Sequence, residues 1–292
     1  MSVNFVSAEA EITGKEKVTS ILSAVKCQDF NLPDLNSGYE KHESEAYQIK
    51  DIEYAACDGK KIQAYVVRPL TNSKQAAILY VHWLDANTKD SNRTQFLEEA
   101  KIMATKGVSS LLISTFWSIP GGYYFERRWQ DDYQNTLHQL KDLQHAVEIL
   151  KSIPNVDSNN LHFVGHDYGA TFGAMLLSVD QSFNSAVLMA AIADISDWYV
   201  YGSGSGVPQA NELDKFKQQF HSVNPHRLIQ YSNAKILFQY AKNDFFISSQ
   251  QAEALYTKAA KGAEVEFYDS DHSLKVEAAK NDRMKWLEKV IR

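Results

Sequence analysis

The chain has 292 residues, of which 44% are hydrophobic and 23% charged, and its formal net charge is −6. These values predict a soluble globular protein with a substantial core, and the lack of a lysine- and arginine-rich run excludes a typical nucleic-acid-binding stripe. No apolar stretch approaches the ~18 residues that span a bilayer, and residues 1–30 lack a basic start followed by an apolar core. We therefore expect a cytoplasmic protein with no nucleic-acid or membrane partner.

Residues 1–45 mix polar residues with one amphipathic helical pattern from Val18 to Cys27, and we interpret them as a lead-in that packs on the main body. Cys27 and Cys57 are too few for a disulfide framework, and they lack a CxxC or Cys/His metal spacing. We interpret both as ordinary thiols and expect no metal site.

Residues 46–56 and 61–70 alternate apolar and polar side chains around a turn at 57–60, which predicts an antiparallel pair of strands. Further strands are predicted at 76–83, 108–117, 161–166, 185–192, 234–240 and 263–272, with helices between them, including 96–107, 131–151 and the closing 276–292. This alternation indicates an α/β domain over residues 46–292: a mostly parallel central sheet with an antiparallel start and helices on both faces. Residues 193–233 form an excursion from the sheet that could serve as a minimal lid.

Residues 161–170, LHFVGHDYGA, run from an apolar strand through a glycine-flanked turn into a helix of small residues. This arrangement is typical of a nucleophile elbow, with Asp167 at the position where serine hydrolases have serine. The alternative is a glycine-flanked turn with a solvated Asp. A carboxylate is ionised at neutral pH without a base, and it suits displacement at saturated carbon better than attack on a carbonyl.

Ligands of such sheets bind beyond the carboxyl ends of the strands, so residues that directly follow strands are candidates for catalysis. Asp167, Asp244 and His272 each follow a predicted strand, in the order nucleophile, acid, histidine. We predict that they form a catalytic triad; the alternatives are a turn-forming Asp and a solvated surface His. Rivals for the acid are Asp194, Asp197 and Asp271, while His166 is interpreted as structural.

On these motifs, residues 46–292 resemble the α/β-hydrolase superfamily. GHDYGA is similar to the elbow of its aspartate-nucleophile branch, the epoxide hydrolases and dehalogenases of that fold. The antiparallel start, the short excursion and the AKND and SDHS segments look more like dienelactone hydrolases and peptidase-like esterases, whose nucleophile is cysteine or serine. The segment between Ile192 and Lys235 is too short for the full cap of an epoxide hydrolase, and Tyr168 stands where haloalkane dehalogenases have tryptophan.

The resemblance implies an oxyanion hole made by the backbone N–H groups of Trp83 and Tyr168. Aromatic residues also crowd two segments that follow strands, and Pro120-Gly121-Gly122 places one set on a loop. An apolar, partly closed pocket is therefore expected, although such aromatic residues can equally belong to the core. The predicted substrate-binding residues are His82, Trp117, Tyr123, Tyr124, Trp129 and Trp198.

Three functional hypotheses follow for a protein whose partner is a small-molecule substrate. In the first, Asp167 attacks a small apolar epoxide or halogenated substrate to form an alkyl-enzyme ester, which water activated by His272 hydrolyses without a cofactor. The second is a dienelactone hydrolase-like esterase or lactonase with a variant nucleophile. The third is a non-catalytic ligand-binding protein with a hydrolase fold. The sequence indicates no oligomeric state.

Overall fold

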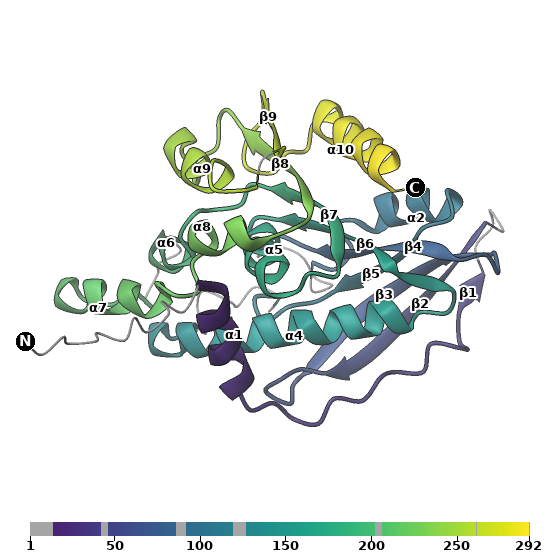
Figure 1. Cartoon of the computed structure of the whole chain (residues 1–292), viewed down its shortest axis with the longest axis horizontal. Helices are drawn as coiled ribbons and strands as arrows, with labels where there is room; N and C mark the ends of the chain where they lie inside the picture. Colours follow the sequence, from purple (N-terminus) through teal and green to yellow (C-terminus); the bar gives the residue numbers. More distant parts are fainter. Residues whose placement is uncertain are drawn as a thin grey trace, which may run out of the picture.

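The computed structural model describes residues 14–41, 46–85, 92–118, 127–201, 206–260 and 262–291. In these residues the strands form one nine-stranded sheet in the order β1-β2-β3-β5-β4-β6-β7-β8-β9 (Figure 1). Strands β1 to β3 are antiparallel to their neighbours, and β4 to β9 run parallel. The strands are β1 (Glu40–Lys41), β2 (Tyr47–Ala55), β3 (Lys61–Pro69), β4 (Gln75–Val81), β5 (Ser109–Ile113), β6 (Val156–His166), β7 (Phe183–Met189), β8 (Lys235–Ala241) and β9 (Glu264–Tyr268). The predicted α/β class with an antiparallel start is confirmed.

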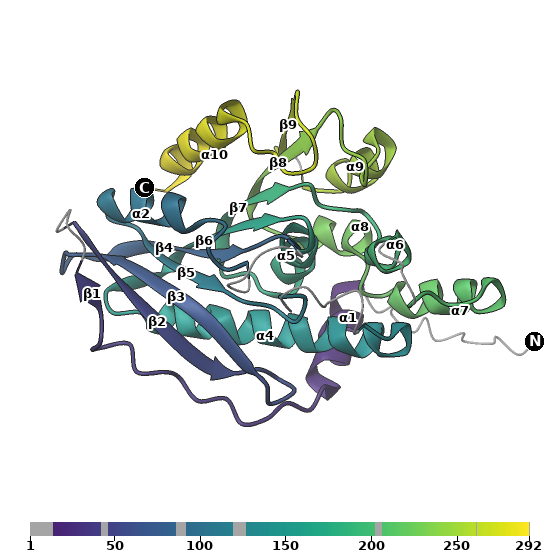
Figure 2. The same cartoon turned by 180° about the vertical axis from the view of Figure 1, so that it is seen from behind.

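Helices cover both faces of the sheet, which explains why β4 is buried along its whole length (Figures 1 and 2). Helices α2 (Leu97–Thr105) and α10 (Glu277–Val290) lie on one face, where the Arg283 Nε donates to Glu99 Oε2 at 3.0 Å. Helices on the other face include α1 (Gly14–Ala24), α4 (Asp132–Ser152) and α5 (Tyr168–Val179). As predicted, α2 ends next to Gly107, whose φ of 84° suits a residue without a Cβ.

The remaining helical segments lie on either side of β8 in the sequence. They are α6 (Ile195–Tyr201), α7 (Ala210–Phe220), α8 (Pro225–Leu228) and α9 (Ser249–Tyr256), with short 3₁₀ turns at Trp129–Asp131 and Ile229–Tyr231. Helices α6 to α8 fall in the predicted excursion between β7 and β8. Its function as a lid, and the division of the chain at residue 45, stay predictions.

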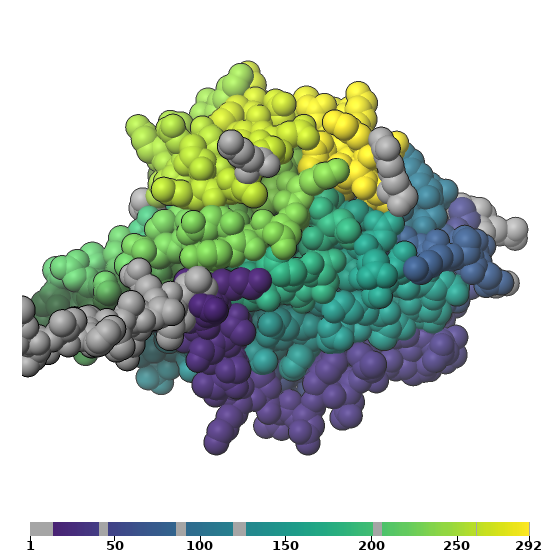
Figure 3. All heavy atoms as spheres, viewed as in Figure 1, coloured from purple at the N-terminus to yellow at the C-terminus, as the bar shows by residue number. Residues whose placement is uncertain are grey.

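The N-terminal segment packs along the body, where its purple residues lie against the teal ones in Figure 3. Val18 and Leu22 of α1 are buried in the main hydrophobic core, as is Leu35. Cys27 and Cys57 form a disulfide that ties this segment to the turn between β2 and β3. The interpretation of both cysteines as thiols was wrong, because sequence spacing does not reveal that the segment folds back over this turn.

The disulfide also bears on the expected cellular location. Disulfides are rare in cytosolic proteins because the thiol buffers there keep cysteines reduced. The cytoplasmic location stays a prediction, and the disulfide weighs against it. No helix within the described ranges has the length and apolar character needed to cross a bilayer.

Candidate active site

Asp167 occupies a sharp turn between the end of β6 and the start of α5. Its backbone is strained, with φ 56° and ψ −117°, and its N–H donates to the Met189 carbonyl at 2.8 Å. A Cβ at Gly169 would lie 2.2 Å from the Val81 carbonyl oxygen, and one at Gly165 would lie 2.6 Å from the Gly169 oxygen. Only glycine therefore fits at these two positions, and the elbow geometry predicted from GHDYG is confirmed. The alternative of a solvated Asp is wrong, because Asp167 is only 4% exposed.

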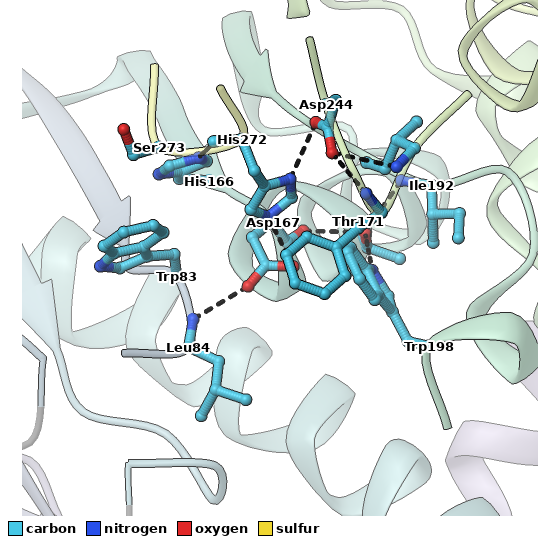
Figure 4. A network of polar contacts seen from close by, with 12 residues as sticks. Trp83, Leu84, His166, Asp167, Thr171, Ile192, Trp198, Asp244, His272 and Ser273 are labelled. Carbon is cyan, nitrogen blue, oxygen red and sulfur yellow. Dashed lines mark hydrogen bonds and ion pairs between the residues drawn. The ribbon is translucent and has the colours of Figure 1, made fainter. Parts of the chain in front are cut away.

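The structure brings the three predicted triad side chains together (Figure 4). His272 Nδ1 lies 2.8 Å from Asp244 Oδ2, and His272 Nε2 lies 3.6 Å from Asp167 Oδ1. The other oxygen of Asp244 accepts the backbone N–H groups of Phe246 at 2.8 Å and Ile247 at 3.0 Å. Asp244 is thus held by its own loop with one oxygen directed at the imidazole.

The rival acids have other partners. Asp194 accepts the Ser196 N–H, and Asp197 pairs with Lys217. Asp271 accepts both the N–H and the hydroxyl of Ser273. The orienting position therefore belongs to Asp244. Within the described ranges, no group of three or more His, Cys, Asp or Glu side chains is arranged to hold a metal ion.

A backbone N–H from the segment that follows β4 contacts Asp167, but it is not that of Trp83. The Leu84 N–H donates to Asp167 Oδ2 at 3.0 Å, whereas the Trp83 N–H donates to the Gln95 side chain at 2.8 Å. The prediction of Trp83 as a donor was wrong by one residue, because Gln95 turns that N–H away from the elbow. Tyr168, the other predicted donor, is the first residue of α5, and its role stays a prediction.

The charge state of His272 follows from its two carboxylate neighbours. Burial by itself lowers the pKa of His272, but its polar contact with Asp167 at 3.6 Å, its hydrogen bond to Asp244 and the negative charges of both carboxylates together raise it to about 10. At neutral pH the resting site therefore contains an imidazolium between two carboxylates. A cationic imidazole cannot accept a proton, so His272 must lose its own before it can act as a base.

Two aromatic rings lie beside the triad. The Trp198 ring is 5.7 Å from that of His272 and stacks on Tyr168 at 5.5 Å. The Phe246 ring lies 5.0 Å from His272. Trp198 thus lies beside His272, and its role in substrate binding stays a prediction. Phe246 was not among the predicted residues, and its sequence signal is its position two residues after Asp244.

The other predicted substrate-binding residues lie elsewhere. His82 is buried, with Nδ1 bonded to the Trp83 carbonyl and Nε2 to the Ser118 hydroxyl, so both ring nitrogens are engaged within the protein. Trp117 is fully buried and stacks on Phe172, so it belongs to the core. Trp129 packs against Phe216 of α7. Tyr123 and Tyr124 lie outside the described residues.

The sequence of this chain matches a known protein family. Residues 94–292 match the model of the prolyl oligopeptidase family. The chain belongs to the prolyl oligopeptidase family. Dipeptidyl-peptidase 5 of Porphyromonas gingivalis is 26% identical over 216 residues, which are 69% of this chain and 31% of that protein. This member of the family thus spans about a third of the length of that relative, and it has Asp167 at the elbow.

Solved structures similar to this member of the prolyl oligopeptidase family share its fold at low sequence identity. Acetyl xylan esterase 1 from Thermoanaerobacterium sp. has a TM-score of 0.73 and 12% identity, covering 96% of this chain and 94% of its own. A prolyl endopeptidase has a TM-score of 0.64 and 17% identity, and the match covers 86% of this chain and 39% of the endopeptidase chain. A protein described as a dienelactone hydrolase, from Klebsiella pneumoniae, has a TM-score of 0.58 and 16% identity, covering 82% and 97%. The α/β-hydrolase fold is confirmed, while resemblance to the aspartate-nucleophile branch rests on the elbow sequence.

Proposed function

We propose that this protein is a hydrolase in which Asp167 attacks a saturated carbon of a small apolar substrate, forms an alkyl-enzyme ester and is regenerated by water. The observation that supports it is the different surroundings of the two Asp167 oxygens. Oδ2 accepts the Leu84 N–H at 3.0 Å, whereas Oδ1 is buried 3.6 Å from His272 Nε2 and has no hydrogen-bond partner among the described residues. An anionic oxygen without hydrogen bonds is the more nucleophilic of the two.

In the first step, a lone pair of Oδ1 forms a bond to the substrate carbon. The bond from that carbon to the leaving oxygen or halogen breaks, and the leaving group keeps the electron pair. Asp167 thereby loses its negative charge, and Asp244 remains as the one carboxylate beside His272. The pKa of His272 then falls, so that the imidazolium can release its proton to solvent and become a base.

In the second step, neutral His272 takes a proton from a water molecule, whose oxygen adds to Cγ of Asp167. Negative charge develops on Oδ2, which already accepts the Leu84 N–H. Collapse of this intermediate breaks the bond between Cγ and the original Oδ1, and the departing alkoxide takes the second proton of the water. The first proton stays on His272, which restores the imidazolium between two carboxylates.

The surroundings of His272 favour an apolar substrate, and among apolar substrates an epoxide. Trp198 and Phe246 place aromatic rings beside the imidazole. The indole N–H of Trp198 donates to the Thr171 hydroxyl at 3.2 Å, and that of Trp117 donates to the Trp83 carbonyl at 3.4 Å. Neither indole N–H is directed at a halide ion, so we rank epoxides ahead of alkyl halides. The oxygen of an opened epoxide takes its proton from water.

The structural relatives favour a second candidate, the hydrolysis of carboxylic esters, since one of them is named an acetyl xylan esterase. The geometry ranks it second. Asp167 Oδ2 occupies the Leu84 N–H that would otherwise stabilise the oxyanion of an acyl substrate. Attack by a carboxylate on an ester would also give an anhydride, which is more reactive than the ester it came from.

A single turnover in water enriched in heavy oxygen distinguishes these candidates, because the alkyl-ester route puts the water oxygen into the enzyme and none into the new hydroxyl of the product. With styrene oxide, we expect heavy oxygen in the peptide that contains Asp167 and ordinary oxygen in the new hydroxyl of the diol. Turnover of nitrophenyl acetate with heavy oxygen only in the acetate would support the second candidate. Tight binding of either compound without turnover would support the non-catalytic hypothesis.

A further inference from the structure

The side chain of Gln95 lies between the end of β4 and the elbow. Its Oε1 accepts the Trp83 N–H at 2.8 Å, and its Nε2 lies 2.6 Å from His166 Nδ1. A backbone N–H can only donate, so the amide must present its oxygen to Trp83 and its NH₂ to His166. His166 Nδ1 is therefore the acceptor and carries no proton.

His166 continues this chain of hydrogen bonds to the loop that carries His272. Because Nδ1 is an acceptor, the proton of the neutral ring is on Nε2, which donates to the His272 carbonyl at 3.0 Å. Burial, followed by the neighbouring charges of His272, Arg283 and Lys275, lowers the pKa of His166 well below its usual value. His166 is fully buried, and only the neutral Nε2–H form satisfies both of its partners.

A stack of side chains supports the same loop from the direction of β4. The Trp83 ring is parallel to that of His166 at 5.1 Å, and the Lys275 ammonium lies 5.0 Å from the Trp83 ring (Figure 4 shows Trp83, His166 and His272). Between His272 and Lys275, Leu274 has a left-handed backbone with φ 49°. A strained conformation of this kind persists only where its surroundings impose it.

We propose that Gln95 and His166 are positioning residues that hold the Leu84 N–H and the His272 imidazole in register on either side of Asp167. At one end of this series of hydrogen bonds, Gln95 holds the N–H of Trp83, the residue before Leu84. At the other end, His166 holds the backbone carbonyl of His272. The kinetic part of this inference rests on the proposed function, because hydrolysis of the ester needs the Leu84 N–H and the His272 imidazole at the same time. Neither residue touches the reacting atoms.

The substitution Gln95→Glu tests this series of hydrogen bonds at the Gln95 amide, which fixes the direction of the bond to His166. It replaces the NH₂ group by an oxygen, so His166 must place a proton on Nδ1. As a neutral ring, His166 would then direct a lone pair at the His272 carbonyl; as an imidazolium, it would put a positive charge beside His272. We expect NMR spectra of the ring nitrogens to show a protonated His166 Nδ1 and a changed His272 titration midpoint.

His162→Gln is the matched control, because His162 is also buried on β6 but bonds to Ser185 and Asn160. We expect it to leave the His272 signals unchanged. A second pair of variants separates loss of the hydrogen bond from a general effect on folding. His166→Gln keeps a donor for the His272 carbonyl, and His166→Leu has none. His272 should be perturbed less in His166→Gln than in His166→Leu.

The kinetic arm uses styrene oxide as the probe. In Gln95→Glu, we expect the ester on Asp167 to form while its hydrolysis slows by about tenfold to a hundredfold, as small misplacements of catalytic groups commonly cause. Unchanged His272 signals in both Gln95→Glu and His166→Leu would overturn the proposal, as would altered signals with wild-type hydrolysis. If the wild-type protein forms no ester, the proposed function fails, while the NMR comparison still decides whether the chain positions His272.

Discussion

Nε2 of His272 lies 3.6 Å from Oδ1 of Asp167, on the side of the ring away from the Asp244 carboxylate. In a serine-type triad, this position belongs to a neutral hydroxyl, and the resting histidine is a neutral base. Here a second negative charge keeps the imidazole protonated. In the proposed mechanism, the charge on Asp167 therefore controls when His272 can act as a base.

The raised pKa of His272 predicts a stability that decreases in alkali. Folding raises this pKa from about 6.5 to about 10, so the folded protein binds the proton more tightly than the unfolded chain. The stabilisation is fully present below about pH 6.5 and is lost as pH rises toward 10. The groups that face the ring are the carboxylates of Asp167 and Asp244 and the neutral His166. Urea unfolding across this range should show a steeper alkaline loss in the wild type than in His272→Gln; equal slopes would contradict the prediction.

Asp167→Asn should abolish multiple turnovers, because an amide lacks the anionic oxygen that attacks carbon. The fold should persist, since the two side chains are nearly isosteric. Turnover at the wild-type rate, with peptide mass spectrometry excluding deamidation to Asp, would show that Asp167 is not the nucleophile.

Asp167→Ser tests the same site in the opposite direction. It removes the negative charge beside His272 Nε2 and places a hydroxyl on the elbow, which is the serine-type arrangement. The pKa of His272 should fall, and hydrolysis of nitrophenyl acetate should appear. Loss of epoxide turnover without any gain of ester hydrolysis would mean that the Leu84 N–H and His272 do not form a working acyl-transfer site.

The α/β fold and the meeting of Asp167, Asp244 and His272 were predictable from the sequence, while their catalytic roles stay a prediction. Apolar stretches bounded by turn residues predicted the strands of the sheet. Gly165 and Gly169, which the turn requires because a Cβ would clash there, predicted the elbow. Asp244 and His272 were found because the carboxyl ends of parallel strands share one edge of the sheet.

The features that were missed depend on contacts between distant segments. Nothing near Cys27 in the sequence shows that it meets Cys57. The N–H that contacts Asp167 belongs to Leu84 and not to the predicted Trp83, because Gln95 accepts the N–H of Trp83. His82 was misassigned because the loop after β5 folds back to engage its ring, which neighbouring residues do not indicate.

The disulfide predicts a stability that depends on reduction but leaves the site unchanged. Cys27 and Cys57 are 30 residues apart, and closing a loop of that size contributes about 3.6 kcal/mol in the chain-entropy model. Reduction, or the double change Cys27→Ser with Cys57→Ser, should lower the free energy of unfolding by about this amount. The His272 titration should not move. Labelling of both thiols in the unreduced, unfolded protein would show that the bond is not present.

The change His272→Gln separates the two chemical steps, because the mechanism needs the histidine as a base only when the ester is hydrolysed. With styrene oxide, we expect one equivalent of substrate to be consumed quickly and then no further turnover. The protein mass should rise by that of the substrate, with the adduct on the peptide that contains Asp167. Loss of a general base slows hydrolysis by about a hundredfold to ten-thousandfold, which is enough for the ester to accumulate.

The double variant His272→Gln with Asp167→Asn is the control for this experiment, since it should form no adduct at all. Wild-type turnover by His272→Gln would rule out His272 as the base that activates water. Loss of even the first equivalent would have a different meaning: the imidazolium would then be needed while the substrate carbon is attacked. In that case His272 would act as an acid that protonates the leaving oxygen in the first step. Asp244, whose Oδ2 lies 2.8 Å from His272 Nδ1, would then be needed in both steps.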